Sequence, residues 1–526
     1  MNVLLMHRER DFDADQPLPW NFDDVVADLG LSWIFQAMAE EDEVVDAVVR
    51  RAFAASLTDV DAILYRQAAL TDALRNPDVV RAIYDLASST VQDERKHYFG
   101  LLRDHPDTIL RRSVEVMAMF AERFGSLRKI AEQHVGTFES EAFDRLFLEV
   151  QTELNDAYLA RIDTHIKDLR FRGGILLSAR LGPGNVGSEY VLREPNQPEG
   201  GYFKRLLTKG PATFGFTIPE RDDNGFRALD ELRDRGVNDV ANALAQSNDH
   251  ILGFFRALRD ELAFYVGAIR LHERLAAKGE PTCMPEPHPA GDAHRSFQAL
   301  YDPALSLQLE GRTVPNDLGA DGKDLIVTTG ANHGGKSTFL RALGIAQLMT
   351  QCGLFAPAHA ATLSVSNGLY THFKREEDTE LESGKFDEEL ARMSAIVGHL
   401  EPGALLLLNE SFSATNEREG SEIARQVVTT LLERGVSVLF VTHLYDFARS
   451  MHDEHDERHL FLRASRSESG ARSFKLDVAP PLPTSFGEDL YREVFGEAPH
   501  DPEPAPRAPV SGREDRTPAE GAIGND

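Results

Sequence analysis

The stretch LIVTTGANHGGKST, residues 325–338, decides the fold of the second half of this chain. Its apolar start predicts a buried strand, and the pattern after its glycines predicts an amphipathic helix from Lys336 to about Gln351. Glycines between a strand and a helix let backbone N–H groups approach phosphates, and the helix N-terminus adds a favourable field. The stretch therefore predicts a phosphate-binding loop from Gly330 to Ser337.

This loop predicts ATP and Mg²⁺ as cofactors. We expect Lys336 to reach the β and γ phosphates, the Ser337 hydroxyl to bind Mg²⁺, and Thr338 to assist at the α phosphate. The predicted nucleotide-binding residues are Gly330, Ala331, Asn332, His333, Gly334, Gly335, Lys336, Ser337 and Thr338.

Two further apolar runs end in polar residues downstream of the loop. LLLLNE, residues 405–410, predicts a buried strand that ends where a carboxylate could face the γ phosphate and its attacking water. Residues 436–443, VSVLFVTH, predict a second such strand. Glu410 is the candidate general base, His443 is placed to sense or hold the γ phosphate, and Lys336 completes the candidate catalytic set.

The chain divides by pattern into a helical part and an α/β part. Apolar residues recur in steps of three and four along 110–130, 143–169 and 244–269, which predicts long paired helices, with 143–169 as one helix. Glycine-punctuated, strand-like runs predict a small β-rich insertion at about 173–220, with Phe214, Phe216 and Ile218 alternating as on one strand. Residues 278–292, with four prolines, are interpreted as a linker.

The expected division is therefore a helical region over 1–292 with its β-rich insertion, and a domain of alternating strands and helices over 293–498. The composition of residues 499–526, rich in Pro, Glu, Arg and Gly, predicts a disordered tail. The alternation of strands and helices over 293–498 predicts a sheet whose ligand lies at the carboxyl ends of its strands.

Composition limits the possible partners and compartments. Only two cysteines occur, and no window reaches the ~18 apolar residues of a membrane span, so we expect a soluble, cytoplasmic protein. The formal net charge of −29 disfavours general coating of nucleic acid. Local DNA contacts stay open, because short basic runs occur at Arg111–Arg112, Lys167 to Arg172 and Lys204 to Lys209, each of which also fits a solvated surface.

Together these motifs resemble the MutS ATPases, whose founding members initiate DNA mismatch repair. The segments that carry the resemblance are Val314 to Asp317, TGANHGGKST at 329–338, Glu382 to Phe386, Asn409–Glu410, Thr415, Glu419–Gly420, Thr442–His443 and Ser485 to Gly487. Residues Ile63 to Gln67 and the long helices resemble the family's lever region. The β-rich segment occupies the place of its DNA clamp.

The resemblance implies a multidomain fold in which an α-helical lever region precedes an α/β P-loop ATPase domain of ABC type. It implies a homodimer through the ATPase domains, with Ser413 and Thr415 acting in trans on the partner's nucleotide, and no membrane. Ser337 and Asn409 are the implied Mg²⁺ residues. Because Asn409 replaces the usual aspartate and contributes no negative charge, we expect slow turnover.

Other departures from the family also affect the expected function. Thr313 stands where the family has an aromatic residue near the adenine, which puts base stacking there in doubt. Phe412 and Ala414 replace small glycines of the trans loop, so we expect its backbone path to differ. Residues 1–20 do not resemble the family's mismatch-recognition domain, and the region after Pro499 is short for a nuclease module, so we expect neither mismatch recognition by that route nor nuclease activity.

Two functions remain open from the sequence. The first is a MutS-like, ATP-dependent DNA-binding protein in which ATP binding and hydrolysis rearrange a clamp or lever on DNA, possibly mismatched or branched. The alternative is an ATP-switched interaction protein that acts on a protein or ribonucleoprotein partner. An unrelated kinase or GTPase does not fit the Asn409–Glu410 pair, and the sequence has no guanine-specifying Asn-Lys-x-Asp segment.

Overall fold

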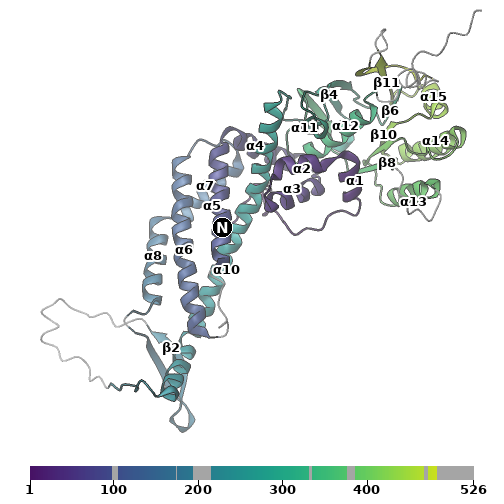
Figure 1. The fold of residues 1–526 in the computed structure, drawn as a ribbon. Coiled ribbons are helices and arrows are strands. Elements are labelled where there is room, and N and C mark those ends of the chain that lie inside the picture. The colour runs from purple at the N-terminus through teal and green to yellow at the C-terminus, as the bar shows by residue number, and fades with distance from the viewer. Residues whose placement is uncertain are drawn as a thin grey trace, which may run out of the picture.

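The chain forms an elongated molecule in which a helical arm extends from an α/β part (Figure 1). The computed structural model describes residues 1–96, 105–172, 174–193, 215–330, 334–375, 385–466 and 472–482. The predicted tail at 499–526 and the basic run at Lys204 to Lys209 lie outside these ranges. No helix within them combines the length and apolarity that crossing a membrane requires.

The arm is built around one very long helix, α10, that runs from its tip to the α/β part. At 55 residues, α10 extends over about 80 Å, because an α-helix rises about 1.5 Å per residue. It packs along α5 and α6. The arm helices are α4 (Val60–Arg75), α5 (Pro77–Lys96), α6 (Pro106–Gln133), α7 (Glu141–Glu153), α8 (Asp156–Leu169) and α10 (Asp223–Ala277).

The prediction of one helix over 143–169 is wrong, because α7 ends at Glu153 and α8 begins at Asp156. Asn155 causes the break: its side chain accepts a hydrogen bond from the Tyr158 N–H at 3.0 Å and so caps α8. The apolar period continues across the break, since both helices pack on α6. Periodicity alone therefore did not reveal the interruption.

The tip of the arm is a two-stranded antiparallel hairpin of β1 (Leu176–Leu181) and β2 (Gly187–Arg193), with the turn η1 (Pro183–Asn185). The predicted strand through Phe214, Phe216 and Ile218 is not found. Phe214 lies outside the described ranges, and Phe216 and Ile218 belong to an irregular segment. Phe216 is 86% exposed, which shows that its apolar side chain does not pack against a sheet.

The α/β part contains a six-stranded sheet in the order β12-β11-β6-β10-β9-β8. All its neighbours pair in parallel except β12, which runs antiparallel to β11. The strands are β6 (Leu325–Gly330), β8 (Leu369–Phe373), β9 (Leu405–Asn409), β10 (Ser437–Val441), β11 (His459–Arg466) and β12 (Arg472–Val478). The associated helices are α12 (Lys336–Gln351), α13 (Lys385–Val397), α14 (Glu417–Glu433) and α15 (Tyr445–Asp453).

A second, four-stranded sheet in the order β3-β7-β4-β5 lies where α10 enters the α/β part. Its strands are β3 (Glu286–His288), β4 (Arg295–Leu300), β5 (Asn316–Gly319) and β7 (Ala360–Ser364), and a short helix, α11 (Pro303–Gln308), follows β4. The segment expected to be a linker, 278–292, thus contributes strand β3 and the turn η2 (Ala290–Asp292).

Three N-terminal helices connect the arm with the α/β part: α1 (Phe22–Leu29), α2 (Leu31–Ala39) and α3 (Glu43–Ala55). Helices α2 and α3 pack on α10, while α1 contacts β8 and α12. One apolar core consequently runs without interruption from the upper arm into the α/β part. A second core lies under α14 and α15, and a small third core lies in the lower arm.

Candidate nucleotide-binding site

Two glycines frame the segment between β6 and α12. Gly330 ends β6 with a φ of 112°, and a Cβ there would lie 3.0 Å from the backbone nitrogen of Ala464. Gly335 has a φ of 88° and precedes the first residue of α12. Both positions therefore favour glycine, and the N-terminus of α12 comes directly after Gly335. Ala331, Asn332 and His333 lie outside the described residues.

Lys336, the first residue of α12, is held against the strand that precedes it. Its Nζ donates to the carbonyl oxygen of Gly330 at 3.0 Å, and the residue is only 5% exposed. Burial lowers the pKa of the ammonium group, and the negative charge of Glu410 opposes that shift. The lysine thus provides a positive charge with little water around it, where charge–charge attraction is strong.

Ser337 and Asn409 meet between the start of α12 and the end of β9. The Ser337 hydroxyl donates a hydrogen bond to Asn409 Oδ1 at 2.8 Å. Oxygen atoms of hydroxyl and amide groups are ligands that Mg²⁺ accepts, directly or through water. The pair consequently fits a Mg²⁺ position, although both side chains are neutral.

Glu410 and His443 follow the ends of the neighbouring strands β9 and β10. Glu410 Oε1 lies 3.0 Å from His443 Nε2, and the Glu410 backbone N–H bonds the Val441 carbonyl at 2.8 Å. Glu410 has a φ of 55°, a backbone conformation rare for a residue with a side chain. The hydrogen bond from His443 lowers the pKa of Glu410 against the opposing effect of burial, so the carboxylate is ionised near neutral pH.

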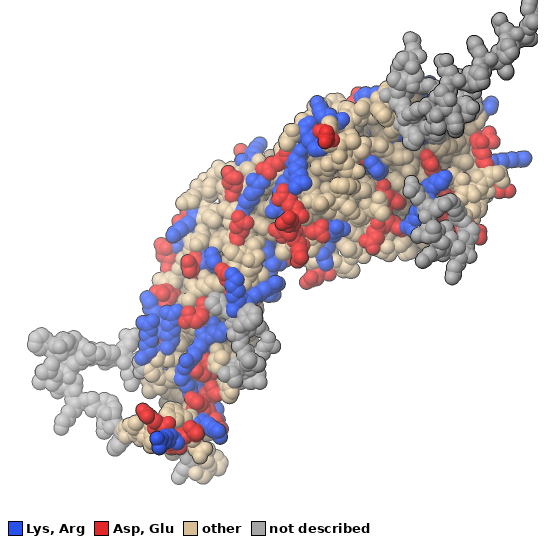
Figure 2. Space-filling view, in the orientation of Figure 1, with Lys and Arg blue, Asp and Glu red and all other residues tan. Residues whose placement is uncertain are grey.

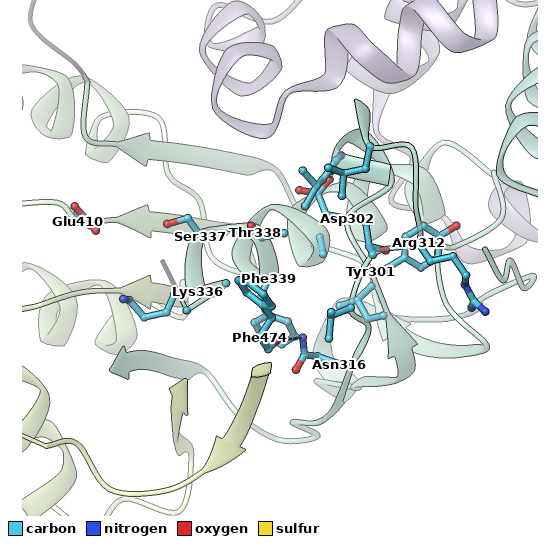
Figure 3. A pocket seen from close by; sticks show the side chains of 18 of the residues that line it. Tyr301, Asp302, Arg312, Asn316, Lys336, Ser337, Thr338, Phe339, Glu410 and Phe474 are labelled. Atoms are coloured by element: carbon cyan, nitrogen blue, oxygen red, sulfur yellow. Dashed lines mark hydrogen bonds between the residues drawn. The ribbon is translucent and has the colours of Figure 1, made fainter. Parts of the chain in front are cut away.

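These side chains line one cavity of about 860 Å³, a size that suits a nucleotide (Figure 3). Gly334, Gly335, Lys336, Ser337, Thr338, Glu410 and His443 all contribute to its wall. Asn409 touches this group through Ser337. Of the predicted residues that the structure describes, only Ser413 and Thr415 lie apart from the cavity and its immediate partners.

Sequence reasoning did not identify the apolar end of this cavity. Its wall includes Tyr301, Leu305, Phe339 and Phe474, together with Thr313. Phe474 comes from β12, far along the chain, and is fixed there by Asn316, whose amide donates to the Phe474 carbonyl at 3.1 Å. No short-range pattern signals such a contact, because the two residues meet only through the tertiary fold.

Thr313 does line the cavity, at the position where the resemblance implied an aromatic ring. Its backbone N–H and its hydroxyl both donate to Glu280 Oε1, at 2.8 and 2.9 Å. Both groups are buried. The threonine therefore fixes the chain that enters β5, and the aromatic surface of the cavity is supplied by other residues.

The loop with Ser413 and Thr415 follows β9 and Glu410, but neither residue lines the cavity. Thr415 Oγ1 donates to Glu419 Oε2 at 2.7 Å, and Ser413 Oγ is buried without a hydrogen-bond partner among the described residues. Phe412 is fully buried with a φ of 63°, a conformation that favours glycine. Gly420 permits this path, since a Cβ there would lie 2.4 Å from the Phe412 carbonyl.

Two family models match the chain, one in its helical part and one in its α/β part. Residues 58–278 match the MutS2 N-terminal domain, and residues 326–487 match MutS domain V. The first covers the arm, and the second covers the part of the cavity formed by Gly334 to Phe339, Glu410, His443 and Phe474, but not the lining residues from Leu300 to Asn316.

Curated relatives agree with both models. The chain is 33% identical over 185 residues to the DNA mismatch repair protein MutS of Thermus aquaticus, over 35% of this chain and 22% of the relative. It is 29% identical over 368 residues to that of Methanosarcina mazei, over 68% of this chain and 37% of the relative. For Chloroflexus aurantiacus the identity is 29% over 265 residues, 46% of this chain and 27% of the relative. The chain thus spans well under half the length of these relatives.

The fold and the cavity define a multidomain protein whose helical region is joined to an α/β domain with a nucleotide-sized site. With both family models and the named relatives in agreement, the chain belongs to the MutS family.

Proposed function

We propose that this protein is a cytoplasmic, Mg²⁺-dependent ATPase that binds DNA, and that ATP binding and hydrolysis rearrange its helical arm. The observation that carries the proposal is the meeting of Lys336, the Ser337–Asn409 pair and the Glu410–His443 pair around one cavity. The division into a lever region at 1–292, with a clamp-like insertion at about 173–220, and a P-loop ATPase domain at 293–498 belongs to the same proposal, as does a disordered tail at 499–526.

In this proposal Gly330 to Thr338 bind the triphosphate, with Lys336 near the β and γ phosphates. Ser337 and Asn409 would hold Mg²⁺, which neutralises phosphate charge when bound. Because Asn409 carries no charge, we expect turnover to be slow.

Glu410 is the proposed general base. Its ionised carboxylate would orient and deprotonate the attacking water, and His443 would hold that carboxylate in place through the 3.0 Å contact. The lowered pKa of Glu410 keeps it in the proton-accepting form at neutral pH.

We further propose a homodimer in which Ser413 and Thr415 approach the nucleotide of the partner subunit. The support is that neither residue contributes to the cavity wall of its own subunit, while the loop that carries them begins directly after Glu410. The Ser413 hydroxyl is buried within its own subunit, so in this proposal the loop rearranges before Ser413 reaches the nucleotide of the partner subunit.

The arm is the proposed DNA-binding region. Lysine and arginine side chains gather over its lower half, mixed with carboxylates (Figure 2). Several are already paired: Lys167 Nζ lies 2.5 Å from Asp163, and an Arg111 nitrogen lies 2.9 Å from Asp107. Phosphates must compete for these cations, so binding is expected to weaken steeply with salt. The relatives reported above are named DNA mismatch repair proteins, which favours DNA over the protein-partner alternative.

ATP hydrolysis at low salt, with and without duplex, branched and mismatched DNA, tests the proposal. We expect Glu410→Gln to lower kcat by roughly 10²- to 10⁴-fold while ATP still binds, because the general base is lost. Lys336→Ala is expected to weaken ATP binding itself. Glu433→Gln, at the exposed end of α14, is the matched control and should hydrolyse ATP at the parent rate.

Hydrolysis by Glu410→Gln at the parent rate would refute the assignment of the base. A hydrolysis rate that no DNA form changes, together with no retention of any DNA at low salt, would refute the DNA-coupled function.

A further inference from the structure

A cluster of two histidines and an aspartate lies at the edge of the four-stranded sheet, outside the nucleotide cavity. His288 ends β3 and His294 precedes β4, and their ring centroids lie 4.3 Å apart. Strand β7 positions both. The Ser364 N–H donates to the His294 carbonyl at 2.8 Å, the His294 N–H donates to Ser364 Oγ at 3.0 Å, and His288 is opposite Ser364 in the β3–β7 register.

The turn between the two histidines supplies the carboxylate. Asp292 ends η2, where its N–H bonds the Pro289 carbonyl at 3.1 Å, and Ala293 then takes the left-handed conformation with a φ of 52°. Asp292 Oδ2 lies 3.9 Å from His288 Nδ1. One potential ligand atom from each of His288, Asp292 and His294 lies within 4.8 Å of the other two.

Two more carboxylates flank the histidines. Asp321 Oδ2 lies 3.8 Å from His294 Nδ1, while its other oxygen accepts bonds from the Arg295 N–H and the Ser296 hydroxyl at 2.8 and 2.9 Å. The bond from the Arg295 N–H is the main cause of the lowered pKa of Asp321. Glu286 Oε1 lies 3.6 Å from His288 Nε2, the ring nitrogen on the other side from Asp292.

We propose that His288, Asp292 and His294 bind a divalent transition-metal ion of the zinc class, with Asp321 as fourth ligand. Imidazole nitrogens and carboxylate oxygens bind Zn²⁺ at about 2.0–2.2 Å, so the side chains of His288, Asp292 and His294 need to move by only about 1 Å toward a common centre. Asp321 lies outside this group and would have to move further from its position near His294 to complete the site. Two imidazoles in the set favour Zn²⁺ over Mg²⁺, which prefers oxygen ligands. Glu286, whose Oε1 lies 3.6 Å from His288 Nε2, is the positioning residue that would accept the outer N–H of His288 when the metal is bound, as carboxylates commonly do behind a metal-bound histidine.

The position of the cluster indicates a structural role. Asp321 precedes the amino end of β6, whereas Gly330 and the nucleotide cavity lie at its carboxyl end. A metal ion there would join the segment that leaves α10 to the turn before β6. It would thereby fix the entry of the arm into the α/β part, at a segment that by composition is only a proline-rich linker.

Metal binding by the full chain, purified without a histidine tag and stripped with a chelator, tests the proposal. We expect titration with Zn²⁺ to give one tight site per chain that also raises the melting temperature. The double variant His288→Gln/His294→Gln should lose that site and that shift. Glu286→Gln should retain the site with roughly tenfold to hundredfold weaker affinity, as is usual when the partner of a ligating histidine is removed.

The pair His452 and His455 offers a matched control, since their rings lie 6.1 Å apart but they do not form a three-ligand group in the described chain. His452→Gln/His455→Gln should therefore bind Zn²⁺ as the parent does. Protection of His288 and His294 from diethylpyrocarbonate by Zn²⁺ in the unaltered protein gives a readout that does not depend on any variant folding. Equal Zn²⁺ affinity in the parent and in a folded His288→Gln/His294→Gln protein, or no protection of the two rings, would overturn the proposal.

Discussion

The two ends of the arm differ sharply in how they are packed. At its upper end, the joint with the α/β part, charged side chains are buried and their hydrogen bonds are satisfied by segments far apart in sequence. At the tip, β1, β2 and the start of α10 leave large apolar side chains in solvent, such as Leu181 at 78%, Val186 at 63% and Phe226 at 43% exposure. The buried hydrogen bonds of the joint hold its segments in one arrangement, whereas the tip exposes apolar side chains to solvent.

Arg66 is the central side chain of the joint. It is fully buried and donates to the carbonyls of Met6 and Cys352, both at 3.1 Å, and its guanidinium lies 5.5 Å from the ring centroid of Phe264. His7 Nε2 lies 3.2 Å from its remaining nitrogen, and burial together with the Arg66 charge lowers the pKa of His7 to about 3. The N-terminal segment, the arm and the end of α12 thus share one buried cation.

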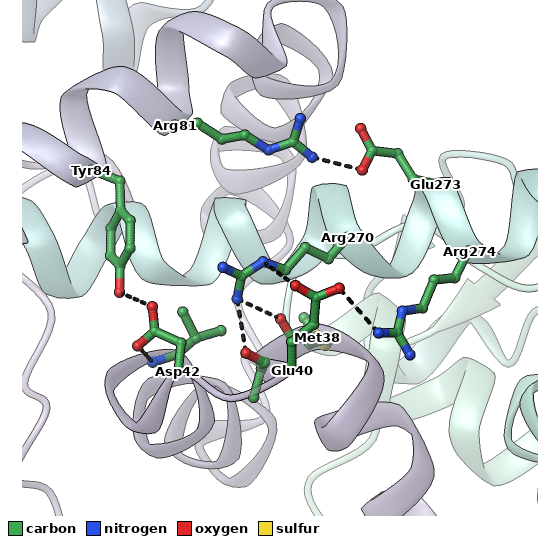
Figure 4. A network of polar contacts seen from close by, with 10 residues as sticks. Met38, Glu40, Asp42, Arg81, Tyr84, Arg270, Glu273 and Arg274 are labelled. Carbon is green, nitrogen blue, oxygen red and sulfur yellow. Dashed lines mark hydrogen bonds and ion pairs between the residues drawn. The ribbon is translucent and has the colours of Figure 1, made fainter.

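A polar network extends the joint along α10 (Figure 4). Glu40, in the turn between α2 and α3, lies 3.0 Å from Arg274 and 3.5 Å from Arg270. The Tyr84 hydroxyl donates to Asp42 at 2.6 Å, and Arg81 pairs with Glu273 at 2.6 Å. These contacts connect α10 and α5 to the helices that reach the α/β part. A movement at the joint would therefore be transmitted to the arm. Toward the tip, by contrast, a cavity of about 510 Å³ lies between α6, α8 and α10.

The largest effect is expected from Arg66→Ala. It removes donors from two buried carbonyls and leaves a cavity between three segments, which should lower the free energy of unfolding by about 3–5 kcal/mol. Chemical denaturation followed by circular dichroism measures this loss. A change below 1 kcal/mol would show that the joint does not depend on this side chain.

The joint should also make stability depend on pH. Burial raises the pKa of Glu261 to about 7, above its unfolded value. The folded protein therefore binds the proton more tightly, so this group stabilises the fold most below about pH 4.5 and loses that contribution as the pH rises through 7. The expected loss is about 3 kcal/mol, measured as unfolding free energy from pH 5 to 8, and Glu261→Gln should remove this part of the slope.

At pH 8, where Glu261 is ionised, Glu261→Gln should lower stability by about 2 kcal/mol. The carboxylate accepts the backbone N–H groups of Leu5, Met6 and Phe12 at 2.5, 2.8 and 2.8 Å. An amide replaces one accepting oxygen by a donor, which leaves at least one buried N–H unpaired. Amide hydrogen exchange at residues 5–12 should accelerate in the variant, and unchanged exchange there would contradict this role.

The smallest effect is expected at the tip. Leu181→Ser should change the unfolding free energy by no more than about 0.5 kcal/mol, because the side chain is already in solvent. The same measurement on Leu258→Ser, at a fully buried position of α10, supplies the contrast and should show a loss of several kcal/mol. Equal losses in the two variants would remove the distinction between tip and joint.

Local pattern was sufficient for some elements and failed at others. The strands that end at Asn409 and Val441 are apolar runs followed by polar residues, and the strand that ends at Gly330 leads into a glycine-rich loop, so the presence of these strands and their approximate ends could be predicted directly. The helix break at Asn155 was not readable, because a cap residue also occurs inside surface helices. The strand predicted through Phe216 is not found, because alternating apolar residues do not by themselves provide a neighbouring strand with which to pair.

The sequence by itself determined the phosphate-loop pattern, the polar residues at the strand ends and the long helices, because each depends on residues close together in the chain. Only the tertiary structure decided that Phe474 reaches the cavity, that Arg66 and Glu261 fasten the N-terminal segment to the arm, and that His288, Asp292 and His294 converge. These contacts result from strand register and helix packing between distant segments. No local pattern encodes these contacts, because they form and stabilise the protein only when the distant segments pack together in the core.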